Sequence, residues 1–275
     1  MDWLQALWLG ILQGLSEYLP ISSSGHLEIL KQLLGVDVDP DASLQFSVML
    51  HVATVLSTIV VLWREFAPLC KSFFTFKNDD NTRYVLKILL SCIPVAIVGF
   101  AFKKDIERLF DGNLTVVGIC LCVTAALLAF SYFFRTSPLT ARTYKPRDIT
   151  WLDALVIGIA QAVAVLPGLS RSGATIATGV AIGDKREKVA QFSFFMVIIP
   201  ILGEALLDVK DMLFPEAGEQ AAQASIGIVP LIVGFLAAFI FGCLACKWMI
   251  NLVKKGKLVW FAVYCLAVGI ICLIF

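Results

Sequence analysis

The chain has 275 residues, of which 59% are hydrophobic and only 16% are charged. A soluble domain has about 45–50% apolar and about 25% charged residues, so this composition excludes an ordinary soluble protein and indicates a polytopic membrane protein. The formal net charge of +1 says nothing about partners, and no nucleic-acid partner is expected.

The eight cysteines lie in apolar runs or near the end of one, and no histidine has the spacing that a zinc site requires. We therefore interpret them as small residues of the core. No basic region precedes the first apolar run, which Glu17 interrupts, so a signal peptide is not expected.

The first half of the chain opens with two short apolar segments, 3–15 and 24–35, around a polar turn. Each segment is shorter than the roughly 20 residues needed to cross a hydrocarbon core of about 30 Å. Pro20 blocks continuation of the first helix, and Gly25 permits a tight turn. The pattern predicts a re-entrant hairpin, which is tolerated in a membrane only when protein or a wet cavity encloses the turn.

Longer apolar stretches follow this hairpin and predict three membrane spans, at 45–64, 84–103 and 114–134. The segment 65–83 is basic and aromatic, which indicates a position at the membrane interface. A polar connector over 135–149 closes the first half.

The second half repeats the pattern. A short helix is expected at 150–166, a polar turn at 167–175 and another short helix at 176–183. The remaining spans are expected at 189–212, 226–247 and 258–275.

An internal repeat relates segments of about 1–135 and 150–275. A shift of 148 positions superimposes polar and glycine residues in the same order: Gly10 on Gly158, Gln13 on Gln161, Ser22 on Ser170, Ser24 on Ser172 and Gly25 on Gly173. Each half has three crossings, an odd number, so the second half is expected upside down relative to the first. The predicted fold is an all-α polytopic membrane protein with inverted repeats, six spans and two re-entrant hairpins, in one integral membrane domain. Such repeats place their site near the bilayer midplane, where the halves meet.

Charge placement predicts the orientation of this fold. Most of the 22 Lys and Arg residues fall in loops that would share one face, within 64–87, 135–147, 185–188 and 247–257. The positive-inside rule makes that face cytoplasmic. Both termini and the mouth of the first hairpin are then expected to face outward.

Arg171 lies in the second polar turn, inside the predicted membrane region, where a charged side chain is costly. Its neighbours supply hydroxyls and backbone N–H groups suited to an anion, and phosphate fits such a cradle best. The candidate cradle residues are Gly168, Ser170, Ser172, Gly173 and Thr175. An arginine that snorkels to a headgroup or pairs with a carboxylate is the structural alternative.

Glu17 has three candidate roles: metal ligand, general base or ion-pair partner of Arg171. Gln13 lies one helical turn earlier, so both side chains would share a helix face. A carboxylate and an amide oxygen suit a hard cation such as Mg²⁺ or Ca²⁺, with phosphate and water completing its shell.

The chain has two histidines, and they carry different expectations. His26 lies three residues after Ser23, which places both on one helix face, within reach for general acid–base work. For His51, in the first full span, a functional role and a structural hydrogen bond are equally favoured.

These motifs resemble those of a known family. Gln13-x-x-x-Glu17, Leu-Pro-Ile-Ser-Ser-Ser-Gly-His at 19–26 and Pro-Gly-Leu-Ser-Arg-Ser-Gly-Ala-Thr at 167–175 are similar to the signatures of the integral-membrane undecaprenyl-diphosphatases of the bacitracin-resistance type. The resemblance covers essentially the whole chain. It implies the inverted-repeat fold with two re-entrant hairpins, and an enzyme of the bacterial plasma membrane. The family motif often has glutamate where this chain has Gln13, which leaves one carboxylate fewer and the number of metal ions open.

The resemblance also implies site roles and a substrate. The enzyme would remove one phosphate from undecaprenyl diphosphate and so recycle a lipid carrier for wall precursors. Ser23 would be the nucleophile, Ser22 and Ser24 its neighbours, and Arg171 the diphosphate clamp.

A phospholipid transporter is the alternative from another class, because broken helices in inverted repeats also build transporters. Glu17, Ser23 and His26 favour the enzyme, since a carrier needs only the arginine and the hydroxyls. The expected partners are a polyprenyl diphosphate and membrane lipids. The oligomeric state stays open, with a homodimer as the candidate.

Overall fold

The computed structural model describes residues 1–102, 114–136, 146–213, 226–256 and 258–274. Regular structure in these ranges is helical, apart from one isolated bridge between Arg147 and Asp184. The helices are α1 (Trp3–Ser16), α2 (Ser23–Leu33), α3 (Pro40–Val61), α4 (Trp63–Phe74), α5 (Asp80–Ala101), α7 (Leu114–Thr136), α9 (Trp151–Val163), α10 (Arg171–Ile182), α11 (Arg186–Met196), α12 (Ile198–Leu213), α13 (Ile228–Lys254) and α14 (Val259–Ile274).

Within the described ranges, five helical stretches are long and apolar enough to cross a membrane. They are Ala42–Val61, Asp80–Ala101, Leu114–Phe134, Arg186–Leu207 and Ile228–Lys254. The sixth expected span, 258–275, forms the apolar helix α14, whose 16 residues rise about 24 Å. The chain is therefore a polytopic, all-helical membrane protein.

Two details differ from the sequence-based expectation. The single span expected at 189–212 is two helices, α11 and α12, which meet at Val197. Pro200 lies in the first turn of α12, where its missing N–H costs nothing but prevents a continuous helical ladder. In the segment 65–83, the chain forms the separate amphipathic helix α4. The expected connector over 135–149 lies largely outside the described residues.

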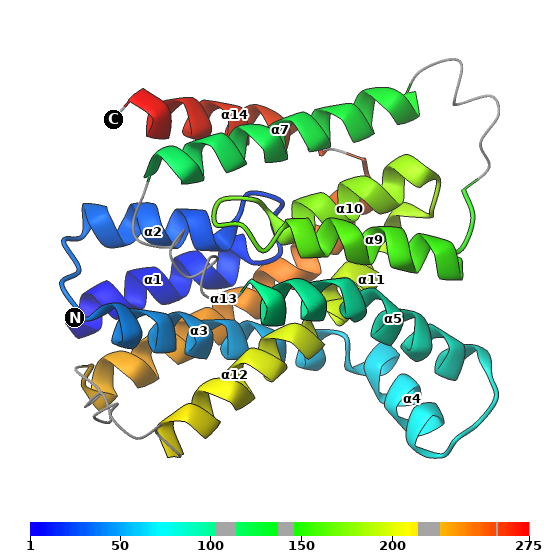
Figure 1. Cartoon of the computed structure of the whole chain (residues 1–275), viewed down its shortest axis with the longest axis horizontal. Helices are drawn as coiled ribbons and strands as arrows, with labels where there is room; N and C mark the ends of the chain where they lie inside the picture. Colours follow the sequence, from blue (N-terminus) through cyan, green and yellow to red (C-terminus); the bar gives the residue numbers. More distant parts are fainter. Residues whose placement is uncertain (103–113, 137–145, 214–225, 257, 275) are drawn as a thin grey trace.

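The two helix–turn–helix units enter the molecule from opposite ends. In Figure 1, α1 and α2 come from the left and α9 and α10 from the right, and their turns meet near the centre. The long helices surround these units: α13 packs along α1 and α3, α5 along α9, and α7 along α14 and α10. This arrangement brings the polar turns together inside an apolar shell.

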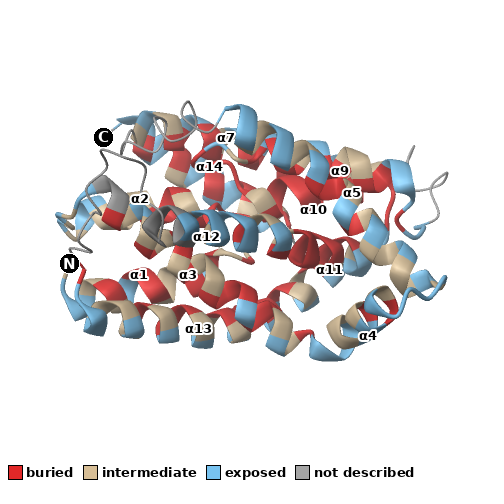
Figure 2. Ribbon diagram, turned by 60° about the horizontal axis from the view of Figure 1, so that its bottom comes forward, coloured by how far each residue is buried: buried red, intermediate tan, exposed pale blue. Residues whose placement is uncertain are grey.

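Small residues let the helices approach closely. A Cβ atom added at Gly10 would collide with the carbonyl oxygen of Gly234 in α13, and one added at Gly158 with that of Ser91 in α5. Gly10 and Gly158 are equivalent in the internal repeat, so both halves use the same close contact against a long helix. Close backbone approach through small residues is the usual basis of helix packing in membranes, where lipid is as apolar as a side chain. Figure 2 shows that α10 and α11 are buried over most of their length.

Each helix–turn–helix unit has an open end, opposite its turn. Different polar contacts hold the two open ends together. In the first unit, Gln5 forms a capping box with Asp2 and donates its Nε2 to the carbonyl oxygen of Leu34, 3.0 Å away. In the second, Arg147 forms a bidentate pair with Asp153, with N–O distances of 2.6 and 2.8 Å. The backbone of Arg147 also bonds to Gly183 and Lys185, which flank Asp184.

Asp184 itself is buried at this open end of the second unit, just after α10. It is 1% exposed, and neither carboxylate oxygen has a hydrogen-bond partner among the described residues. Burial, and then the nearby carboxylate of Asp153, raise the pKa of Asp184 from 3.8 to about 7.

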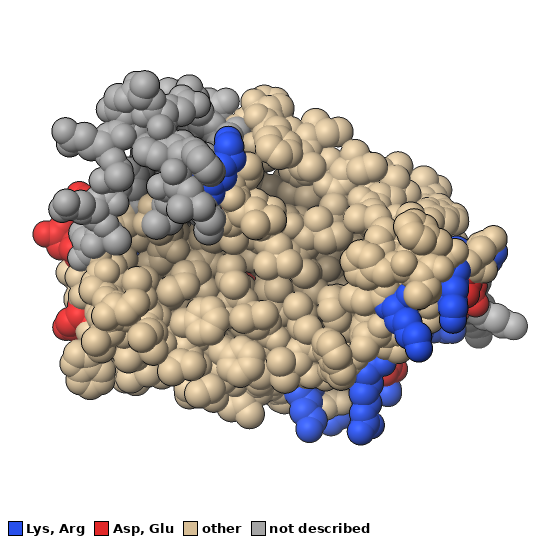
Figure 3. All heavy atoms as spheres, turned by 90° about the horizontal axis from the view of Figure 1, so that it is seen from below, with Lys and Arg blue, Asp and Glu red and all other residues tan. Residues whose placement is uncertain are grey.

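Charged side chains gather at the two ends of the molecule. Figure 3 shows a broad uncharged band, with Lys and Arg mainly at one end, together with some Asp and Glu, and other Asp and Glu at the opposite end. The band has the character expected of a surface that faces lipid.

Candidate active site

Glu17 is the hub of the polar centre. It caps the end of α1, and its side chain is 7% exposed. One carboxylate oxygen, Oε2, accepts from Ser23 Oγ at 2.7 Å and from Gln13 Nε2 at 3.0 Å. The other, Oε1, accepts from Nη2 of Arg171 at 3.2 Å. Three other residues predicted for the site therefore converge on the Glu17 carboxylate from two distant parts of the chain.

The first turn places Ser23 at the start of α2. Ser22 is the N-cap, and its Oγ accepts from the backbone N–H of Gly25 at 3.3 Å. Ser24 lies beside it, with 3.4 Å between the two hydroxyl oxygens. Ser22 and Ser24 thus hold the turn, while Ser23 alone of the three donates to Glu17.

The second turn repeats this capping around Arg171, the first residue of α10. Ser170 Oγ accepts from the N–H of Gly173 at 3.0 Å, and Ser172 Oγ lies 3.4 Å from Ser170 Oγ. Thr175 donates to the carbonyl oxygen of Arg171 at 2.9 Å. In this structure the cradle hydroxyls therefore bond to protein groups, and the Arg171 side chain pairs with Glu17 and is 27% exposed.

The two turns touch each other directly. A Cβ atom added at Gly25 would lie 2.9 Å from Cα of Gly168, whose φ of +88° is one that glycine adopts readily. Ser172 donates to the carbonyl oxygen of Leu19 across the contact, at 3.0 Å. Backbone contact of this kind fixes Glu17 and Arg171 relative to each other.

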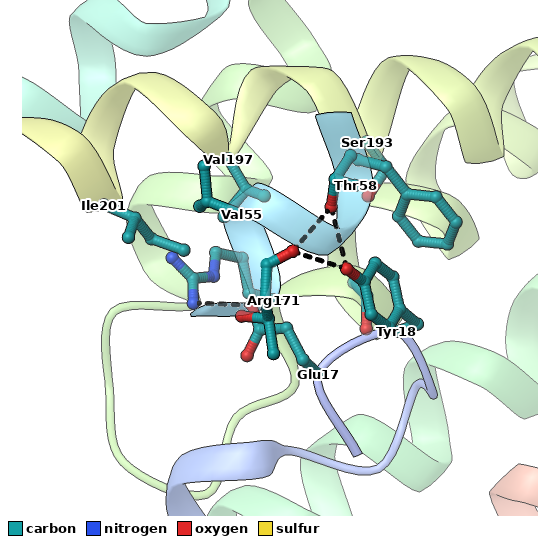
Figure 4. Close-up of a pocket in the computed structure, with 11 residues that line it drawn as sticks. Glu17, Tyr18, Val55, Thr58, Arg171, Ser193, Val197 and Ile201 are labelled. Carbon is teal, nitrogen blue, oxygen red and sulfur yellow. Dashed lines mark hydrogen bonds and ion pairs between the residues drawn. The ribbon is translucent and has the colours of Figure 1, made fainter. Parts of the chain in front are cut away.

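A small pocket lies beside the ion pair. Figure 4 shows Arg171 and Glu17 facing each other, with Ile201 near the guanidinium and Tyr18 and Thr58 on the other side of the pair. The pocket lining combines the two charged groups with the apolar side chains of Val55, Val197 and Ile201. Of the predicted cradle residues, Ser172 lines the pocket.

The two histidines are placed differently from each other. Both ring nitrogens of His26 are engaged away from Ser23: Nδ1 with the carbonyl oxygen of Ser22 at 2.9 Å, and Nε2 with the hydroxyl of Tyr264 at 2.8 Å. His51 Nδ1 bonds to the carbonyl oxygen of Ser47 at 2.7 Å, and its Nε2 lies 3.6 Å from Glu17 Oε2. His51, for which the sequence favoured neither role, is thus the histidine that faces the carboxylate.

Gln13 and Glu17 offer donor atoms for a cation. The Oε1 atom of Gln13 is buried without a hydrogen-bond partner in the described part of the chain, so an acceptor is left over beside the carboxylate. No group of three or more His, Cys, Asp or Glu with metal-site geometry occurs among the described residues. An orphaned amide oxygen next to a carboxylate fits a hard cation that takes its remaining ligands from water and phosphate.

Comparison with known proteins decides the family. The model of the bacitracin resistance protein BacA matches residues 6–271, almost the entire chain. The chain belongs to the BacA family. Full-length relatives agree: the undecaprenyl-diphosphatase of Bacteroides fragilis is 52% identical over 100% of this chain and 98% of its own. That of Bacteroides thetaiotaomicron is 54% identical over 98% and 97%, and that of Methanosphaera stadtmanae 36% identical over 100% and 98%.

Sequence reasoning missed three groups at the centre of this BacA-family chain. Thr124 Oγ1 accepts from the backbone N–H of Ser170 at 3.0 Å, and Ser193 shares a 2.6 Å hydrogen bond with Thr175. Tyr264 bonds to His26 from the last helix. Only Ser193 had a signal, because a shift of 146 residues superimposes Gln45-Phe46-Ser47 on Gln191-Phe192-Ser193; Thr124 and Tyr264 lie in apolar spans with no motif around them.

Proposed function

We propose that this chain hydrolyses undecaprenyl diphosphate to undecaprenyl phosphate and inorganic phosphate. The reaction would recycle the lipid carrier for cell-wall synthesis in the bacterial plasma membrane and so give bacitracin resistance. The names of the full-length relatives and the family support this proposal. The observation that carries it is the 2.7 Å hydrogen bond from Ser23 Oγ to Glu17, whose other oxygen is held by Arg171.

Glu17 is the proton acceptor in this mechanism. A serine hydroxyl attacks phosphorus poorly until a neighbour takes its proton, and Ser23 already donates to Glu17. Ser23 Oγ attacks the terminal phosphorus, its proton passes to Glu17, and the bridging P–O bond breaks to release undecaprenyl phosphate. Water then hydrolyses the phosphoserine and restores the hydroxyl. Direct attack by water, with Ser23 hydrogen-bonded to the substrate, is the competing path.

Arg171 clamps the diphosphate. Its guanidinium pairs with Glu17 and lines the pocket, and its side chain is 27% exposed, so a phosphate oxygen can approach it from the pocket. A planar fork matches two phosphate oxygens at once. Moving the arginine onto phosphate also takes its positive charge away from Glu17, which makes Oε2 a better acceptor for the Ser23 proton.

Gln13 and Glu17 would hold a Mg²⁺ or Ca²⁺ ion. When bound, such an ion neutralises charge on the phosphate oxygens and stabilises the charge that develops in the transition state. The unpartnered Oε1 of Gln13 supports this assignment.

The proposed membrane arrangement has six spans and two re-entrant units, α1–α2 and α9–α10, in inverted halves of about 1–135 and 150–275. The short paired helices support it, as do the meeting of their turns in Figure 1 and the charge polarity in Figure 3. The Lys- and Arg-rich end would face the cytoplasm, with both termini and the opening of the site outside. A homodimer stays a prediction, which cross-linking in native membranes checks.

Phosphate release by detergent-purified protein tests the function. The wild type should release phosphate from undecaprenyl diphosphate, while Glu17→Gln, which keeps shape but not basicity, should be inactive. Transport cannot occur in a micelle, so activity there separates an enzyme from a lipid carrier. Absence of phosphate release by folded wild-type protein, with or without added Mg²⁺ and Ca²⁺, would refute the proposal.

A further inference from the structure

The backbone just before the candidate nucleophile is strained. Ser22 has φ +69° and ψ +97°, and the only other described non-glycine residue with positive φ is Phe76. Such conformations are unfavourable for residues other than glycine and persist only where their surroundings enforce them. Ser170, the equivalent residue of the second turn, has an ordinary φ of −70°. The strain is therefore specific to the turn that carries Ser23.

His26 holds this conformation through two hydrogen bonds to Ser22. The carbonyl oxygen of Ser22 accepts from both the backbone N–H of His26, at 3.2 Å, and its Nδ1, at 2.9 Å. In the second turn the residue equivalent to His26 is Ala174, which has no side-chain hydrogen bond to give. There the cap residue Ser170 is held by Thr124 instead, whose Oγ1 accepts from the Ser170 backbone N–H.

Tyr264 fixes the imidazole in turn. A carbonyl oxygen only accepts, so Nδ1 of His26 carries the hydrogen, and Nε2 of the neutral ring accepts from the Tyr264 hydroxyl at 2.8 Å. The rings also stack, with centroids 5.6 Å apart and planes inclined by 14°. Tyr264 belongs to α14, 238 residues away, and is absent from the pocket lining.

We propose that Tyr264 is a positioning residue for the reaction: acting through His26, it holds the Ser22 carbonyl and so aims Ser23 Oγ at Glu17. The idea rests on the proposed phosphatase function. It assigns His26 to support of the turn and leaves proton acceptance to Glu17. The last helix of the chain thereby controls the geometry of a residue near its start.

Kinetics of Tyr264→Phe test the proposal, because this change keeps the ring stack and removes only the hydroxyl. We expect kcat to fall about 3- to 30-fold with KM nearly unchanged, as for loss of one hydrogen bond that acts on the nucleophile's geometry. In a His26→Ala background the same change should cost less than about twofold, because residues that act through one another are not additive. Tyr84→Phe, whose ring packs on Phe192 away from the pocket, is the matched control and should keep wild-type activity.

A spectroscopic readout separates failure of this idea from failure of the proposed function. The chain has only two histidines, so ¹⁵N-histidine NMR with His51→Gln for assignment resolves His26. The wild type should show the Nδ1–H tautomer with Nε2 hydrogen-bonded, and Tyr264→Phe should shift the Nε2 signal and mix the tautomers. An unchanged His26 spectrum in Tyr264→Phe overturns the proposal whether or not the protein is a phosphatase. Wild-type kcat in Tyr264→Phe, or an equal loss in the His26→Ala background, overturns it as well.

Discussion

The two polar turns of the molecule share a scaffold and differ in chemistry. Ser22 and Ser170 cap α2 and α10 in the same way, each accepting from a glycine N–H three residues on. A second serine lies 3.4 Å from each cap, at Ser24 and Ser172. The turns are thus two copies of one anion-facing loop, as the internal repeat predicts.

Two positions distinguish the copies. The shift of 148 residues places Ser23 on Arg171 and Glu17 on Val165, so the first turn carries the hydroxyl and the carboxylate, and the second carries the cation. Docking the turns through Gly25 and Gly168 joins these parts at Glu17. The comparison teaches that a duplicated loop can build a mixed polar centre when both copies keep the serine caps and each carries different charged or hydroxyl side chains.

The largest expected effect comes from removing the specialised side chain of the first turn. Ser23→Ala should reduce kcat by three or more orders of magnitude with substrate still bound, and should abolish any phosphoenzyme trapped by rapid quench. Ser24→Ala, a change to a hydroxyl that only neighbours the cap, is the control and should cost at most about tenfold. Residual Ser23→Ala activity above about one-hundredth of wild type would assign the attack to water instead.

The second-largest effect on activity is expected from changing Arg171, the cation of the second turn. Arg171→Lys keeps the charge but replaces the planar fork with a point charge, so about 1.5–3 kcal/mol of charge-assisted bonding is lost. We expect kcat/KM for undecaprenyl diphosphate to drop by on the order of tenfold or more. Arg171→Lys that turns over like the wild type would show that the arginine only neutralises Glu17.

The equivalent glutamines give a matched pair for the metal proposal. Gln13 donates to Glu17, whereas Gln161, at the same place in the second half, has Val165 as its neighbour one turn on. EDTA should abolish activity, and Mg²⁺ or Ca²⁺ should restore it. Gln13→Ala should raise the cation concentration needed for half-maximal activity by severalfold, and Gln161→Ala should not. Full activity in EDTA, or equal shifts in the two variants, would contradict a cation held by the first half.

The smallest expected effect concerns stability rather than activity. It comes from the open ends of the two hairpins, opposite their turns. The first is tied by the uncharged Gln5, but the second buries Asp184, with its pKa raised to about 7. Between about pH 4 and 7 the folded protein keeps a proton that the unfolded chain has released, so stability falls as pH rises through this window.

Asp184→Asn should remove this cost. The variant should match the wild type near pH 4 and be more stable at pH 8, by about 1–4 kcal/mol, measured by thermal unfolding in detergent. Asp148→Asn, at an exposed carboxylate paired with Lys185, is the control and should change little at either pH. A pH-independent difference for Asp184→Asn would show that the carboxyl does not titrate in this range.

Much of this organisation follows from local sequence. Serine caps, Pro20 and the glycines mark both turns, and the i, i+4 spacing of Gln13 and Glu17 predicts their contact, which the structure confirms. The convergence of Glu17 and Arg171 agrees with the repeat, because halves inserted in opposite directions, as we propose, would bring equivalent turns to one level.

Other features depend on contacts that no local pattern reports. The partnership of His26 with Tyr264 spans 238 residues and involves one tyrosine in an apolar helix, so periodicity carries no trace of it. The break at Val197 was missed because Pro200 is compatible with the first turn of a new helix as well as with a kink in a long one. Helix α4 was read only as an interfacial segment, because a short amphipathic helix packed on α5 has too few residues to show its period clearly.

The 154-residue separation of Glu17 and Arg171 has a consequence for biosynthesis. Chains elongate at about 5–20 residues per second, so roughly 8–30 s pass between synthesis of the carboxylate and of its cation. An unpaired carboxylate is costly in hydrocarbon, so the first hairpin should stay near the membrane surface, or enter protonated, until the second one arrives. The nascent enzyme would then be inert during insertion, and its reactive centre would form as one of the last events of folding.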